Sequence, residues 1–70
     1  MNEVELSRFV VFCMEAYKRH EFLSGAEVSD LFDRYGVIDY LKEGFDVLHS
    51  LGEMALVDDM RDYISRRGES

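Results

Sequence analysis

Two residues whose types and spacing could support acid–base chemistry are His49 and, three positions earlier, Asp46. Residues three apart on a helix lie on adjacent turns of one face, so the carboxylate could orient the imidazole as in half of a general-base site. Catalysis also needs a third group in a pocket; Ser50 adjoins His49, and Cys13 could approach only in space. The sequence favours a structural histidine that bonds Asp46 or the last carbonyl groups of a helix. We therefore expect no enzyme, with an enzyme that uses His49 and Asp46 as an alternative.

The remaining reactive side chains predict neither a metal site nor a reactive thiol. One cysteine and two histidines are too few for a structural zinc site. Cys13 has no basic neighbour in the sequence and lies in an apolar stripe, where a free cysteine acts as a small buried hydrophobe. Four acidic residues lack the glycine and the alternating oxygen ligands of a calcium loop; they are Glu53, Asp58, Asp59 and Asp62. We expect no metal, no cofactor and no small-molecule ligand.

An acidic strip is expected on the third of the helices described below. Its members are Asp39, Tyr40, Glu43 and Asp46. Carboxylates three or four residues apart on a helix repel one another, so their clustering invites an explanation. One explanation is a docking face for a basic partner. The other, which the sequence favours, is a solvated helix face on which Tyr40 is half buried.

Four helices are expected to position these residues in one all-α domain over 1–70, a compact antiparallel bundle with short loops. Apolar side chains recur at steps of three and four along each helix. Ser24 and Glu27 have the spacing of a capping box, and Gly36 follows its helix as a left-handed cap would. The expected helices span residues 3–20, 24–35, 37–51 and 53–67.

Gly44 lies inside the third of these helices. Ile38, Leu41 and Phe45 continue the helical spacing across it, which favours one helix that kinks there. Glycine in a helix interior costs about 1 kcal/mol relative to alanine. Two shorter helices with a break at Gly44 are therefore the alternative.

The first helix has more apolar surface than one contact with a core requires. Residues 9–14 are apolar all the way round the helix. A second apolar stripe lies roughly opposite the main one, and its apolar members are Val4, Val11 and Met14. Either the other helices enclose this helix, or the second stripe contacts another chain. The sequence leaves both alternatives open.

Composition and charge limit what the chain can bind. A 70-residue domain with one cysteine has a thin stability margin and no internal disulfide, so self-association or a protein partner would add stability. The net charge of −7, from 15 acidic and 8 basic side chains, disfavours direct binding to nucleic acid. The opening residues lack a basic leader and charges interrupt every apolar run, so we expect a cytoplasmic protein without a membrane span.

The middle of the chain resembles a family of short bacterial proteins of unknown function. The most specific parts of the resemblance are Tyr35-Gly-Val-Ile-Asp-Tyr40 and Asp46-Val-Leu-His49. Residues 9–17 and 57–63 resemble that family as well, whereas Phe45 stands where the family pattern has tyrosine. The resemblance implies a small cytoplasmic helical protein with an accessory or antitoxin-like role beside toxin-like or ADP-ribosyltransferase-like proteins.

These observations predict a small protein–protein interaction module that forms a homodimer or binds a protein partner. The alternative is an acidic regulator that masks a basic surface on a toxin or a nucleic-acid-binding protein. The candidate contact residues are Val4, Val11 and Met14 on the first helix, with Asp39, Tyr40, Glu43, Asp46 and His49 on the third.

Overall fold

The computed structural model describes residues 3–68, so the first two and last two residues of the expected 1–70 domain lie outside the described part. The expected all-α fold is confirmed. The helices are α1 (Glu3–Glu21), α2 (Gly25–Tyr35), α3 (Val37–Glu43), α4 (Phe45–Leu48) and α5 (Glu53–Gly68). The bounds expected at 3–20, 24–35 and 53–67 differ from these by one residue, which is within the usual uncertainty of helix ends.

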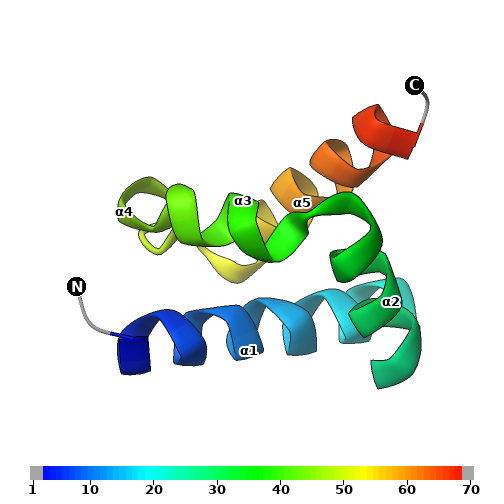
Figure 1. The fold of residues 1–70 in the computed structure, drawn as a ribbon, viewed down its shortest axis with the longest axis horizontal. Helices are drawn as coiled ribbons and strands as arrows, with labels where there is room; N and C mark the ends of the chain where they lie inside the picture. The colour runs from blue at the N-terminus through cyan, green and yellow to red at the C-terminus, as the bar shows by residue number, and fades with distance from the viewer. Residues whose placement is uncertain (1–2, 69–70) are drawn as a thin grey trace.

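The long helix α1 forms one side of the molecule; α3, α4 and α5 lie above it in Figure 1, and α2 crosses its C-terminal end. It packs against α2, α3 and α5. The radius of gyration is 11.3 Å, close to the value of about 11 Å expected for a compact chain of this length. The alternative in which the other helices enclose α1 is therefore wrong.

The hydrophobic core lies between α1 and the helices packed on it. Edge-to-face aromatic pairs connect these elements: the Tyr17 and Phe32 ring centroids are 5.7 Å apart, and those of Phe9 and Phe45 are 5.1 Å apart. The largest fully buried side chains are Phe32, Leu41, Leu56 and Met60. Each of the four longer helices thus contributes one apolar face to a shared core.

The turn between α1 and α2 forms around a residue in the left-handed conformation. Phe22 has a φ of 57°, and the amide of Leu23 donates to the carbonyl of Lys18 at 3.1 Å. This is the long hydrogen bond of a Schellman motif, in which glycine usually occupies the position of Phe22. Leu23 packs against the core, whereas the side chain of Phe22 is 94% exposed.

The ends of α2 follow the sequence signals. The Glu27 amide donates to the Ser24 hydroxyl oxygen at 3.1 Å, and the Ser24 amide donates to a Glu27 carboxylate oxygen at 2.9 Å. These reciprocal bonds confirm the capping box. Gly36 ends the helix with a φ of 66°, as expected for a left-handed cap.

The chain does not continue as one helix from 37 to 51, because α3 ends at Glu43 and α4 begins at Phe45. The structure follows the alternative of two shorter helices broken at Gly44. A Cβ atom at this glycine would lie 2.8 Å from Cδ1 of Leu48, and Leu48 is buried in the core. The glycine therefore allows Leu48 to pack closely against the break, and α4 ends one residue before His49.

Candidate functional site

His49 occupies the structural role that the sequence favours. Its Nδ1 lies 2.6 Å from the carbonyl oxygen of Phe45, to which it can donate. The imidazole also stacks on the Phe45 ring, with centroids 4.5 Å apart and the planes inclined by 8°. Within residues 3–68 the ring is therefore held by Phe45 and not by Asp46, so the arrangement stabilises the end of α4.

The single thiol is buried. Cys13 has no exposed surface and forms part of the core. Burial disfavours the thiolate and raises the pKa of the Cys13 thiol to about 12. The side chain is therefore a protonated core residue at neutral pH, as the sequence predicts.

The described residues contain neither a cluster of metal ligands nor a helix that could span a membrane. No three or more His, Cys, Asp or Glu side chains within residues 3–68 gather closely enough to hold a metal ion. None of the helices in that range is both long enough and apolar enough to cross a membrane.

The acidic strip divides into an exposed part and a structural part. Asp39, Glu43 and Asp46 are exposed. The hydroxyl of Tyr40 instead donates to Oδ2 of Asp59 at 2.5 Å, and its ring stacks on Tyr63 with centroids 4.0 Å apart. Burial, followed by the hydrogen bond to Asp59, raises the pKa of Tyr40 to about 12. Tyr40 therefore joins α3 to α5, and only the three carboxylates remain on the surface.

The second apolar stripe of α1 is exposed at two of its three predicted positions. Val4 is 59% exposed and Val11 57% exposed. Met14, the third, is partly buried and packs against the core. Phe12 is 43% exposed although it is not a member of the predicted stripe, because in the sequence it lies within the all-round apolar run.

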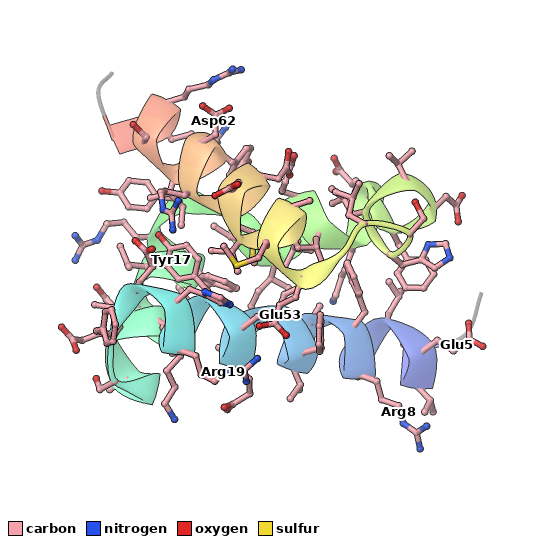
Figure 2. All side chains as sticks on the ribbon, turned by 180° about the vertical axis from the view of Figure 1, so that it is seen from behind. Glu5, Arg8, Tyr17, Arg19, Glu53 and Asp62 are labelled. Atoms are coloured by element: carbon pink, nitrogen blue, oxygen red, sulfur yellow. The ribbon has the colours of Figure 1, made fainter. Side chains whose placement is uncertain are left out.

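Charged side chains accompany these apolar residues on the outer face of α1, which we define as Val4, Arg8, Val11, Phe12 and Glu15. All five are exposed, and Arg8 points away from the other helices (Figure 2). Helical spacing explains the grouping, because positions separated by three, four, seven or eight residues share one side of a helix. The outer face is therefore amphipathic: apolar side chains lie among charges of both signs.

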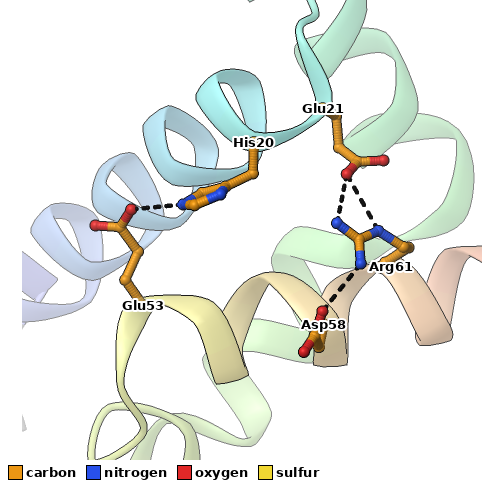
Figure 3. Close-up of polar contacts among 5 residues, drawn as sticks. All are labelled: His20, Glu21, Glu53, Asp58 and Arg61. Carbon is orange, nitrogen blue, oxygen red and sulfur yellow. Dashed lines mark hydrogen bonds and ion pairs between the residues drawn. The ribbon is translucent and has the colours of Figure 1, made fainter.

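The C-terminal end of α1 is tied to α5 by ion pairs that the sequence does not reveal (Figure 3). Glu53 accepts from Arg19 at 2.9 Å, and Nε2 of His20 lies 2.8 Å from the same carboxylate oxygen. About two turns further along α5, Arg61 donates to Glu21 through Nη2 at 2.6 Å. These contacts connect residues more than thirty positions apart, and none of the five residues that define the outer face of α1 takes part in them.

A surface depression of about 560 Å³ is lined by arginines and one tyrosine. Arg34 pairs with Asp30 at 2.8 Å, and Arg66 pairs with Asp62 at 3.0 Å. The Arg67 guanidinium lies over the Tyr63 ring, 5.0 Å from its centroid. Arg34 lies in the last turn of α2, and Arg66 and Arg67 lie in the last turn of α5. Positive charge at these helix ends complements the helix dipole. Local pairing and the dipole together account for these arginines.

The sequence of the chain matches one family of known proteins. A family model described as "Protein of unknown function (DUF3791)" matches residues 8–67. The matched range includes most of α1, all of α2, α3 and α4, and nearly all of α5. No curated protein and no solved structure matches the chain.

Proposed function

The chain belongs to the DUF3791 family, whose function is unknown, and from this premise we propose that it is a small protein–protein interaction module that self-associates. The contact surface is the outer face of α1. The observation that carries the proposal is the exposure of Val4, Val11 and Phe12 along one side of a helix whose other side is already buried.

Exposed apolar residues are common on protein surfaces and need no explanation when they are isolated. Here Val11 and Phe12 follow Val4 by seven and eight residues, which places all three on one side of α1. Burying apolar surface contributes about 25 cal/mol per Å² removed from water. A domain of this size has little core to rely on, so covering this face stabilises the fold as well as the complex.

The size of the face sets the strength of association. α1 has 19 residues, so it is about 28 Å long at 1.5 Å per residue. Contact along one helix buries less than the roughly 800 Å² per partner of a standard stable interface. The proposed complex is therefore weak, with a dissociation constant in the micromolar range or above.

Solution mass measured by light scattering across a hundredfold concentration range tests this proposal. We expect the average mass of the wild-type protein to rise with concentration, and the Val4→Ser/Val11→Ser variant to remain monomeric. The matched control is Val47→Ser, because Val47 is 69% exposed and belongs to α4 instead of the outer face of α1. A wild-type mass that stays monomeric throughout, or a control that dissociates as fully as the double variant, would contradict the proposal.

A second candidate function is an acidic regulator that masks a basic surface on a toxin or a nucleic-acid-binding protein. It is favoured by the exposed carboxylates of Asp39, Glu43 and Asp46, which form no ion pair within residues 3–68. The net charge of −7 would steer a basic partner toward the molecule.

Binding to an arginine-rich peptide, measured at several salt concentrations, tests the second candidate. Replacing Asp39, Glu43 and Asp46 with lysine should abolish binding, while wild-type affinity should fall steeply with salt. Unchanged affinity in the triple variant would exclude the strip as the docking face.

A further inference from the structure

The charges on the outer face of α1 are arranged symmetrically about its apolar centre. Arg8 precedes Val11 by three residues, and Glu15 follows Phe12 by three residues. From Arg8 to Glu15, the side chains along this face are therefore basic, apolar, apolar and acidic. Reversing the direction of the helix exchanges the two charges while leaving the apolar centre in place.

Both charged groups are available for contacts outside the chain. Arg8 is exposed, points away from the other helices (Figure 2) and forms no ion pair within residues 3–68. Glu15 has one ion pair, with Lys18 at 4.0 Å, and both side chains of that pair are largely exposed. Such a contact is weak and is exchanged easily for another.

We propose that a second copy of the chain binds the outer face of α1 in an antiparallel orientation, with Arg8 of each copy facing Glu15 of the other. A two-fold axis passes between Val11 and Phe12, so that Val11 of each copy meets Phe12 of the other. This inference rests on the proposed self-association and specifies its geometry. An isologous contact of this kind repeats each interaction twice, as closed dimers do.

The charge pattern selects this orientation over the parallel one. In a parallel pair, Arg8 would face Arg8 and Glu15 would face Glu15, which places like charges together at both positions. In the antiparallel pair both positions hold opposite charges. Exposed ion pairs add little affinity, so the apolar centre supplies the attraction and the charges determine the register.

Charge-reversal variants test the register. Arg8→Glu puts two acidic groups opposite each other at both ends of the contact, and Glu15→Arg puts two basic groups there. Each variant alone should therefore associate at least several-fold more weakly than the wild type. An equimolar mixture should associate as strongly as the wild type, because each heterodimer again has opposite charges at both ends.

The matched controls change the net charge equally at exposed positions on other helices. Lys42→Glu on α3 corresponds to Arg8→Glu, and Asp33→Arg on α2 corresponds to Glu15→Arg. Neither control residue has an ion pair within residues 3–68. Sedimentation equilibrium gives the association constant of each sample, and circular dichroism confirms that every variant retains its helix content.

Weak association of Arg8→Glu and Glu15→Arg alone, with recovery in their mixture and none of these effects in the controls, is the expected result. A wild-type dimer whose association is unchanged in both variants would overturn the register while leaving self-association intact. A mixture as weak as its components would overturn the Arg8–Glu15 pairing. A monomeric wild type would overturn both the register and the proposed function.

Discussion

At the scale of single residues, Phe22 lowers the stability of the fold through its backbone conformation and gains little from packing. Its φ of 57° lies in the left-handed region, where a side chain with a Cβ is strained by about 1–2 kcal/mol. Its ring is almost fully exposed, so it gains little from burial. Nothing in the packing of α1 on α2 requires an aromatic residue here.

Replacing Phe22 with glycine should stabilise the protein by about 0.5–1 kcal/mol. The substitution relieves the strain of the left-handed conformation. The greater conformational freedom of glycine in the unfolded chain offsets part of this stabilisation. Urea unfolding measures the difference. Phe22→Ala is the control, because it removes the ring but keeps the Cβ and should show no such gain. Equal stabilisation by alanine and glycine would show that the exposed ring, not the backbone, carries the cost.

At the scale of helices, the break between α3 and α4 depends on one missing Cβ. Gly44 has φ −95° and ψ 9°, a conformation that other residues can adopt. The constraint is packing, since a Cβ would lie 2.8 Å from Cδ1 and 3.2 Å from Cγ of Leu48. Leu48 is buried, so it can yield only by disturbing the core.

Gly44→Ala should therefore destabilise the protein by about 1–2 kcal/mol, although alanine has the higher helix propensity. The matched control is Gly25→Ala in the first turn of α2, where an added Cβ meets nothing within 4 Å. The control should be neutral or slightly stabilising. If Gly44→Ala were as stable as the control in thermal unfolding, Leu48 would have room to move and the close contact would not fix the break.

At the scale of the whole molecule, one carboxylate joins the two long helices. Hydrogen bonds from His20 and then Arg19 hold the pKa of Glu53 below its usual value. A carboxyl group whose pKa is lower in the folded state contributes stability that is present above its unfolded pKa. This contribution is lost as pH falls through the folded pKa. The contact between α1 and α5 should therefore weaken on acidification.

The Glu53→Gln variant should lose less stability than the wild type when pH falls below about 4.5, the ordinary value for the group. At neutral pH the same variant should be less stable, because Arg19 and His20 lose their charged acceptor. Urea unfolding across the acidic range provides both comparisons. The control is Glu43→Gln, an exposed residue on α3 without an ion pair within residues 3–68. Identical pH profiles for the wild type and Glu53→Gln would rule out this linkage.

Helix formation could be predicted from the sequence because its determinants are local. The Ser24–Glu27 capping box and the Gly36 cap act within a few residues, so their spacing is visible in the chain itself. The same holds for the buried thiol of Cys13, which lies in the apolar stripe of one helix. The all-α fold and the protonated state of that thiol follow from such patterns.

Only the tertiary structure decided which sides of these helices are covered. Helical spacing groups Met14 with Val11, yet Met14 is partly buried against the core, whereas Val11 and Phe12 are exposed. Likewise, helical spacing predicts that the third helix continues across Gly44. The structure breaks there instead, where the buried Leu48 packs into the space that a Cβ would occupy. The contact between Glu53 and His20 depends on how α5 crosses α1. Packing brings together residues that are distant in the chain. The periodicity of one helix therefore does not predict which part of its surface the neighbouring helices cover.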